Sequence, residues 1–229
     1  MDELIAENKN IYDRIAGHFS ATRRGLWNEL LPFKNLVKNG DRILDVGCGN
    51  GRLYQLFDNL SIDYVGLDQS KNLLAEARKK FPSAQFIVGE MSKLPFAEDS
   101  FDIIFCIAAF HHLPSDELRM RTLKEMKRVL RANGKIVMTN WNGESDWITS
   151  KISYGKIRKL MDDAYHFIIP WKNNKGEVKG LRHYWLLPPD DFTKLMLKVG
   201  LKMDDQYYVS RGERTDKKHG MHIISIISL

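Results

Sequence analysis

The chain has 229 residues, of which 43% are hydrophobic, 28% charged and 10% aromatic. This composition is ordinary for a globular protein and excludes a disordered, collagen-like or disulfide-rich chain. Its 35 basic and 29 acidic residues give a net charge of +6, which is compatible with an anionic partner such as nucleic acid but does not require one.

The cysteines and the apolar segments bear on the cellular compartment. Cys48 and Cys106 are the only two cysteines, too few for a structural zinc site or a disulfide framework. The acidic start of the chain does not resemble a secretory signal. The longest apolar runs fall far short of the ~20 residues of a membrane helix. We therefore expect a cytoplasmic protein with reduced thiols and no membrane contact.

Helices and short strands follow one another along the chain. Apolar residues at helical spacing predict two helices, over 2–19 and 23–38. Five strands are then predicted over 42–46, 64–67, 85–88, 102–108 and 135–139, with helices over 51–57, 70–81 and 115–130 between them. Strands that alternate with helices predict a parallel sheet with helices on both faces.

The remaining third of the chain breaks this rhythm. Residues 141–187 hold four of the five tryptophans and several lysines, and we interpret them as an insertion over the ends of the sheet, on the substrate side. A last helix over 188–199 and two strands over 202–209 and 222–227 predict a terminal antiparallel hairpin. We expect one domain with a seven-stranded, mostly parallel sheet, in four parts: 1–39, 40–140, 141–187 and 188–229.

A glycine-rich segment follows the first predicted strand. Gly47, Gly49 and Gly51 stand at alternate positions, where they let the backbone turn sharply and approach a ligand. Asp68 ends the second strand, 19 residues after Gly49, and can there accept both ribose hydroxyls of an adenine nucleoside. Arg52 occupies the place of the third glycine in the dinucleotide-binding pattern, which disfavours that class of cofactor.

This loop, with Asp45 before it and Asp68 after it, resembles motif I of the class I S-adenosylmethionine (SAM)-dependent methyltransferases. The resemblance implies a Rossmann-like fold with SAM as the cofactor, and it implies that Asp45 supports the amino group of SAM. Glu90, where aspartate is commoner in the family, would accept from the adenine amino group, and Met91 would pack on the ring. The resemblance also implies that Tyr12 closes over the cofactor. The cofactor-binding candidates are Tyr12, Asp45, Gly47, Gly49, Gly51, Asp68, Gln69, Glu90, Met91 and Ile107.

The segment at the end of the fourth predicted strand limits which classes of methyl acceptor are expected. It reads Cys106-Ile107-Ala108-Ala109-Phe110-His111-His112, unlike the polar-Pro-Pro-aromatic motif of enzymes that methylate amino groups of nucleic acids. Cys106 lies inside an apolar strand, so we expect a buried structural thiol and not a nucleophile. No residue pattern indicates a metal site.

Three segments resemble the tRNA wobble-uridine methyltransferases that esterify 5-carboxymethyluridine. They are residues 18–23, the pair His111-His112 and the stretch Arg182-His183-Tyr184, in which His183 replaces the usual aromatic residue. The resemblance implies a tRNA anticodon stem-loop as substrate. A carboxylate is already ionised at neutral pH and needs no general base. The site needs a cationic clamp instead, for which Arg23, Arg182 and His111 are the catalytic candidates.

Other interpretations stay open at this point. A small-molecule enzyme, such as a quinone-biosynthesis C-methyltransferase, shares the glycine loop and the Leu94-Pro95-Phe96 stretch, and a non-enzymatic SAM-binding or scaffold protein is a further alternative. In related enzymes a small zinc-binding activator protein pairs with the edge of the third strand, here 86–88. The tryptophans and lysines of 141–187 are either RNA contacts or core and surface residues.

Overall fold

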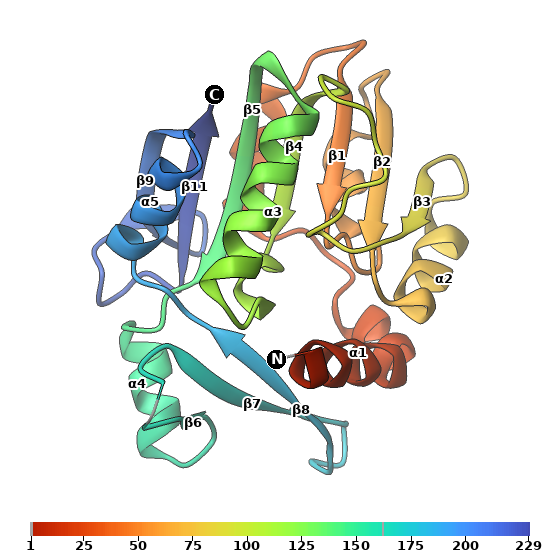
Figure 1. The fold of residues 1–229 in the computed structure, drawn as a ribbon. Helices are drawn as coiled ribbons and strands as arrows, with labels where there is room; N and C mark the ends of the chain where they lie inside the picture. The colour runs from red at the N-terminus through yellow and green to blue at the C-terminus, as the bar shows by residue number, and fades with distance from the viewer. Residues whose placement is uncertain (1, 162) are drawn as a thin grey trace.

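The computed structural model describes residues 2–161 and 163–229. An eight-stranded sheet in the order β10-β9-β11-β5-β4-β1-β2-β3 forms its centre (Figure 1). Five parallel strands supply the nucleotide-binding half: β1 (Arg42–Val46), β2 (Asp63–Asp68), β3 (Gln85–Val88), β4 (Phe101–Ile107) and β5 (Leu130–Trp141). This parallel half confirms the α/β fold expected from the alternation of strands and helices.

The C-terminal strands complete the sheet in antiparallel orientation. β11 (His222–Ser228) pairs antiparallel with β9 (Lys202–Ser210), as the predicted terminal hairpin requires, and its other edge pairs with β5. The short strand β10 (Glu213–Thr215) pairs with β9 and raises the strand number from the seven expected to eight. It lies in a polar segment predicted as a loop, so its sequence carries no strand pattern.

Both faces of the sheet are covered. On one face α3 (Asp116–Val129) and α5 (Pro189–Lys198) pack against a core that includes Ile104 and Cys106. On the other face α2 (Lys71–Lys80) and two 3₁₀ segments pack against a core that includes Ile103 and Phe105. Neighbouring residues of β4 thus enter opposite cores, because successive side chains of a strand alternate in direction.

Two of the predicted helices are wrong in type. The helix expected over 23–38 is a 3₁₀ segment, η1 (Asn28–Leu36), and the helix expected over 51–57 is a second one, η2 (Arg52–Phe57). Pro32 lies inside η1, and proline lacks the amide hydrogen that an α-helix requires there. The strand expected at 135–139 begins earlier, at Leu130, with a register shift against β4.

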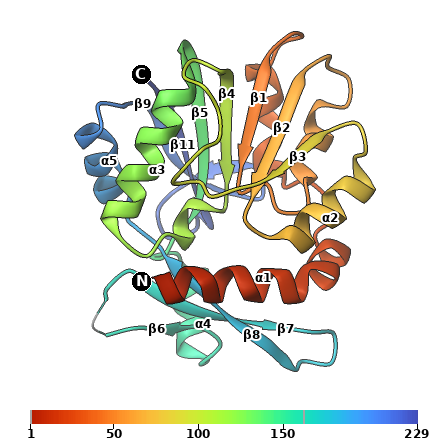
Figure 2. The same cartoon turned by 45° about the vertical axis from the view of Figure 1, so that its right-hand side comes forward.

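Residues 141–187 form a separate small layer beyond the carboxyl ends of the parallel strands. It contains α4 (Asp146–Ser153) and an antiparallel sheet of β6 (Arg158–Lys159), β7 (His166–Lys172) and β8 (Val178–Trp185). The helix α1 (Asp2–Thr22) lies between this layer and the main sheet (Figure 2). In the described part of the chain, no helix has the length and apolar character needed to cross a membrane.

Helix α1 is attached on two sides. The Asn8 amide donates to the carbonyl oxygen of His183 (3.0 Å) and accepts from its N–H (2.8 Å). The Asp13 carboxylate accepts from the Ser70 hydroxyl (2.6 Å) and from the Asn72 N–H (3.1 Å). The helix therefore joins β8 to the start of α2, across the carboxyl ends of the strands.

Candidate active site

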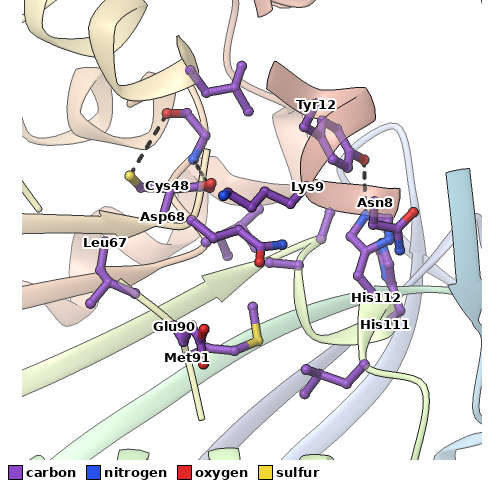
Figure 3. Close-up of a pocket in the computed structure, with 18 of the residues that line it drawn as sticks. Asn8, Lys9, Tyr12, Cys48, Leu67, Asp68, Glu90, Met91, His111 and His112 are labelled. Carbon is purple, nitrogen blue, oxygen red and sulfur yellow. Dashed lines mark hydrogen bonds between the residues drawn. The ribbon is translucent and has the colours of Figure 1, made fainter. Parts of the chain in front are cut away.

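A cavity of about 490 Å³ lies between α1, β8 and the carboxyl ends of β1, β2 and β4. Its volume falls within the roughly 300–1,000 Å³ that small-molecule sites occupy. In Figure 3, Asp68, Glu90 and Met91 lie toward one end of the cavity, and Tyr12, His111 and His112 lie toward the other. The carboxyl end of a parallel sheet is where ligands bind in this class of fold.

The glycine loop forms the floor at the first end. Gly47 and Gly51 have left-handed backbone conformations, with φ of +74° and +73°. A side chain at Gly47 would overlap Ala109, and one at Gly51 would lie 2.8 Å from the Phe86 ring. Gly49 also has a positive φ. A Cβ added at Gly49 would have no neighbouring atom closer than 3.9 Å, so the loop is open toward the cavity there.

Asp68 is fixed by the loop that it faces. One carboxylate oxygen accepts from the Gly49 N–H and the other from the Ser70 N–H, both at 2.8 Å. Burial raises the pKa of this carboxyl, and the two N–H groups oppose that rise. Each oxygen keeps further acceptor capacity toward the cavity. The placement is compatible with the predicted ribose contact.

The remaining predicted cofactor residues divide into two groups. Tyr12, Gly47, Gly49, Gln69, Glu90, Met91 and Ile107 line the cavity together with Asp68, whereas Asp45 and Gly51 do not. Asp45 is buried in β1, where its carboxylate accepts from the Tyr64 hydroxyl at 2.6 Å. Burial raises the pKa of Asp45 to about 7, against the lowering effect of Tyr64. Any support that Asp45 gives to a ligand is therefore indirect.

A hydrogen-bonded chain of rings forms the opposite wall. His112 Nδ1–H donates to the His183 carbonyl oxygen (2.7 Å), so its Nε2 accepts from the Tyr12 hydroxyl (3.0 Å). The Tyr184 hydroxyl lies 3.4 Å from that of Tyr12. Burial lowers the pKa of His112 to about 4, which keeps the ring neutral at physiological pH. His112 therefore takes part in the wall of the cavity as a neutral hydrogen-bonding group.

His111 is buried beside this chain and lines the cavity. Its Nδ1 accepts from the Trp141 N–H at 3.4 Å, which leaves Nε2 as the protonated nitrogen of a neutral ring. Burial and the neighbouring His112 lower the pKa of His111 well below its ordinary value. His111 can thus donate a hydrogen bond but does not carry a positive charge.

The positive charge comes from two arginines. The guanidinium carbons of Arg23 and Arg182 lie 5.3 and 4.9 Å from the ring centre of Trp171, and both residues line the cavity. None of the ion pairs among the described residues includes either one. Arg182 is 7% exposed and its Nε has no hydrogen-bond partner. This buried donor is therefore free to bond a ligand or a water molecule in the cavity.

The charge balance supports an anion site at these arginines. Burial and the nearby Arg182 lower the pKa of Arg23. Burial acts against the charge of Arg182 too, but the Tyr184 and Tyr12 hydroxyls raise its pKa above the ordinary value. Two cations in one desolvated place repel each other. An anion placed between them relieves this repulsion.

Some residues that line the cavity have no role predicted from the sequence. The Arg52 guanidinium carbon lies 4.2 Å from the Trp27 ring centre, and both residues line the cavity. Arg52 was noted only as a departure from a glycine pattern. Asn8 and Tyr184 also line the cavity, although neither was assigned a role. His183 does not line the cavity; its Nδ1 lies 2.8 Å from His166 Nε2, with which it shares a hydrogen bond.

The two cysteines offer no reactive thiol to this cavity, although Cys48 lies at its edge. Both cysteines are free and buried, and burial raises the pKa of each thiol. Cys106 thus remains a structural residue, and Cys48 belongs to the glycine loop at the cavity edge. Within residues 2–161 and 163–229, no three His, Cys, Asp or Glu side chains gather in a way that could hold a metal ion.

Comparison with known proteins agrees with this geometry. Residues 44–138 match the family model described as "Methyltransferase domain". A putative methyltransferase of Encephalitozoon cuniculi is 33% identical over 196 residues, with 85% of this chain and 86% of that protein covered. A Xenopus tropicalis protein named tRNA (carboxymethyluridine(34)-5-O)-methyltransferase alkbh8 is 36% identical over 149 residues, 65% of this chain and 23% of that protein. The chain spans a fifth to a third of the length of the first curated relatives that it matches.

A solved structure shares the fold over nearly the whole chain. It is described as the complex between the Haloferax volcanii Trm112 methyltransferase activator and the putative methyltransferase. Its TM-score is 0.66 at 17% identity, with 95% of this chain and 96% of that chain covered.

Proposed function

The chain belongs to the class I SAM-dependent methyltransferases, and on that premise we propose that it transfers a methyl group to a carboxylate, the carboxymethyl group of a tRNA wobble uridine. One observation carries the proposal. Arg23 and Arg182, neither of them in an ion pair of the described residues, line the same cavity as the glycine loop. A carboxylate is an acceptor that two such guanidinium groups hold well, because Arg binds it through two parallel hydrogen bonds.

The residues of the cavity fit the cofactor of the family. An added Cβ at Gly49 would meet no atom closer than 3.9 Å, so the loop leaves room there, and the Asp68 carboxylate accepts from the Gly49 N–H beside it. Glu90 and Met91 line the same end of the cavity, at the place expected for the adenine. These residues would hold SAM, which supplies an electrophilic methyl group on a sulfonium when it is bound.

The acceptor end needs positioning more than proton transfer. A carboxylate is ionised at neutral pH, so no side chain has to remove a proton from it. This agrees with the neutral states of His111 and His112, whose lowered pKa values suit hydrogen bonding. Arg23 and Arg182 would hold the carboxylate in one orientation, and such positioning alone can supply a large part of the rate enhancement. Tyr12 and Tyr184 line this wall, with their hydroxyls 3.4 Å apart.

The RNA and a protein partner are part of the same proposal. The Xenopus relative carries the name of a tRNA methyltransferase, which favours tRNA over a free small molecule. β3 lies at the edge of the main sheet, and Val88 is 44% exposed there. An uncovered edge strand can pair with another chain. We therefore include a small activator protein on the β3 edge, as in the Haloferax complex of a Trm112 activator with a putative methyltransferase.

Methyl transfer from labelled SAM to bulk tRNA tests the proposal, with mass spectrometry of the product nucleosides. We expect label in a methyl ester of a carboxymethyl uridine, found at the wobble position. Label in a quinone-type small molecule instead would support the C-methyltransferase alternative. SAM binding with no transfer to tRNA, even after a Trm112-type activator is added, would overturn the proposed acceptor.

A further inference from the structure

A second distinctive surface lies outside the cavity, on α4 and the turn that follows it. Between positions 147 and 159 the chain has four basic residues and no acidic one. Two large aromatic residues lie exposed in the same stretch, Trp147 at 36% and Tyr154 at 75%. Exposed aromatic rings next to unpaired positive charge are typical of surfaces that bind a partner.

The rings and the cations lie side by side. Lys151 Nζ lies 5.6 Å from the Trp147 ring centre, and Lys156 Nζ lies 5.9 Å from that of Tyr154. No ion pair of the described residues includes either lysine, whereas the nearby acid Glu144 is paired with Lys217 at 2.8 Å. The other neighbouring acid, Asp146, lies in the first turn of α4, where the helix dipole favours it.

The same helix is anchored by its other face. Ile148 is buried in a core with Phe167 and Tyr184, and Ile152 packs against that core. Positions 148 and 152 are one turn apart and share one face of the helix. Trp147 and Lys151, also one turn apart, form the adjoining stripe; Trp147 is 36% exposed and its ring meets that of Trp141. Replacing Trp147 or Lys151 keeps Ile148 and Ile152, which anchor the helix.

This surface is continuous with the active-site cavity. Trp141 and Tyr184 both line the cavity, and their rings are stacked with centres 5.2 Å apart. The Trp141 ring meets the Trp147 ring edge to face at 5.6 Å. Three aromatic rings thus lead from the acceptor end of the cavity out to α4.

We propose that the surface of α4 and of the turn after it, formed by Trp147, Lys151, Tyr154 and Lys156, binds the single-stranded RNA that flanks the acceptor nucleotide. Bases stack on Trp147 and Tyr154, and phosphates are neutralised by Lys151 and Lys156. Every base offers a face for stacking, and aromatic residues interleaved with basic ones form the usual platform for unpaired strands. The assignment rests on the proposed function, since it places the loop around the methylated nucleotide.

Fluorescence anisotropy with a labelled anticodon stem-loop RNA tests the assignment, over a range of salt concentrations. The variants Trp147→Ala and Tyr154→Ala should each weaken binding about five- to hundredfold, the effect expected for one stacked base. The double variant Lys151→Glu/Lys156→Glu should weaken binding at least tenfold. It should also reduce the slope of log affinity against log salt by roughly 1.5, because two phosphate contacts are lost.

Matched variants separate contact from folding. Lys38→Glu makes half of that charge change, on one exposed lysine just before the amino end of β1 at the opposite end of the sheet, and should leave RNA affinity unchanged. Trp147→Phe keeps a ring and should restore most of the affinity that Trp147→Ala loses. The thermal midpoint of each variant shows that it is folded.

The outcomes distinguish this assignment from the proposed function. RNA binding that is equally tight in the wild type and in all the folded α4 variants would overturn the role of α4. It would not affect the proposal that tRNA is the substrate. A wild-type chain that binds SAM but no RNA would overturn both. Binding to vesicles of anionic lipid in preference to the RNA, lost in the same variants, would assign the face to a membrane and contradict the proposal.

Discussion

Arg23 and Arg182 lie over the same tryptophan ring, with guanidinium carbons 5.3 and 4.9 Å from the centre of Trp171. The two arginines are far apart in sequence: Arg23 directly follows α1, and Arg182 belongs to β8. Their shared platform holds two positive charges at one end of the cavity. The Trp171 Nε1–H donates in turn to His18 Nδ1 at 3.0 Å, which fixes the platform against α1.

Replacing Arg182 should impair methyl transfer more than cofactor binding. A hydrogen bond to a charged group is worth about 1.5–3 kcal/mol, so Arg182→Ala should lower kcat/KM for tRNA roughly 10- to 150-fold. Arg182→Lys keeps the charge but not the planar pair of donors, and should recover part of the loss. Calorimetry should show SAM affinity within a few-fold of the wild type. Arg23→Ala should behave in the same way, and equal turnover in that variant would remove Arg23 from the clamp.

Asp68→Asn should weaken SAM binding by about tenfold or more. The amide keeps the size of the side chain but brings an N–H group toward one of the two backbone N–H groups that now donate to the carboxylate. It also loses a charged acceptor for the ribose. Isothermal titration with SAM measures the effect. Asp58→Asn, a change at an exposed aspartate, is the control, and equal SAM affinity in the two variants would exclude the ribose role of Asp68.

Gly47→Ala should lower the free energy of unfolding by about 1–3 kcal/mol and impair SAM binding. The added methyl group meets Ala109, and φ at Gly47 is +74°; a non-glycine residue held in such a conformation costs of this order. Gly17→Ala is the matched change inside α1, where the added methyl group would meet no other atom within 4 Å. It should raise stability by about 0.5–1 kcal/mol. Denaturant unfolding compares the two, and a stable, SAM-binding Gly47→Ala variant would contradict the close packing of the loop.

Asp45 should make stability depend on pH in the direction opposite to an ordinary paired carboxylate. Its pKa rises from 3.8 to about 7 on folding, mainly through burial. The native state therefore binds more protons than the unfolded state between these values, so the free energy of unfolding falls as pH rises from about 4 to 7. Asp45→Asn should remove this component and gain relative stability above pH 7. Unfolding measured at several pH values tests it; an identical pH profile in the wild type and the variant would refute the buried, protonated state.

The parts of the fold that follow from local pattern could be predicted from the sequence. The apolar run of β4 indicates a strand buried on both faces, and its neighbours Ile103 and Ile104 do enter different cores. The glycine loop and Asp68 could be predicted because their chemistry depends on spacing along a single strand-turn-helix unit. Pro32 also carried a local signal, since it prevents the α-helix expected around it.

The acceptor end of the site depends on contacts that no local pattern contains. Arg23, His111 and Arg182 were found through a family resemblance, but Trp171 beneath the two arginines was not, because β7 and α1 meet only in the tertiary structure. Asp45 shows the converse. Its position before the glycine loop resembles that of a residue that contacts the ligand, yet its carboxylate accepts a hydrogen bond from the Tyr64 hydroxyl of the neighbouring strand.

The two attachments of α1 have a thermodynamic consequence for the order in which ligands assemble. Asp13 bonds to Ser70, two residues beyond Asp68, whereas Asn8 bonds to β8, which carries Arg182. A ligand at either end of the cavity that holds α1 in place lowers the cost of ordering the helix for the ligand at the other end. Such coupling is reciprocal by necessity. Cofactor and acceptor should therefore raise each other's affinity by the same factor, through a helix that contacts both halves of the site.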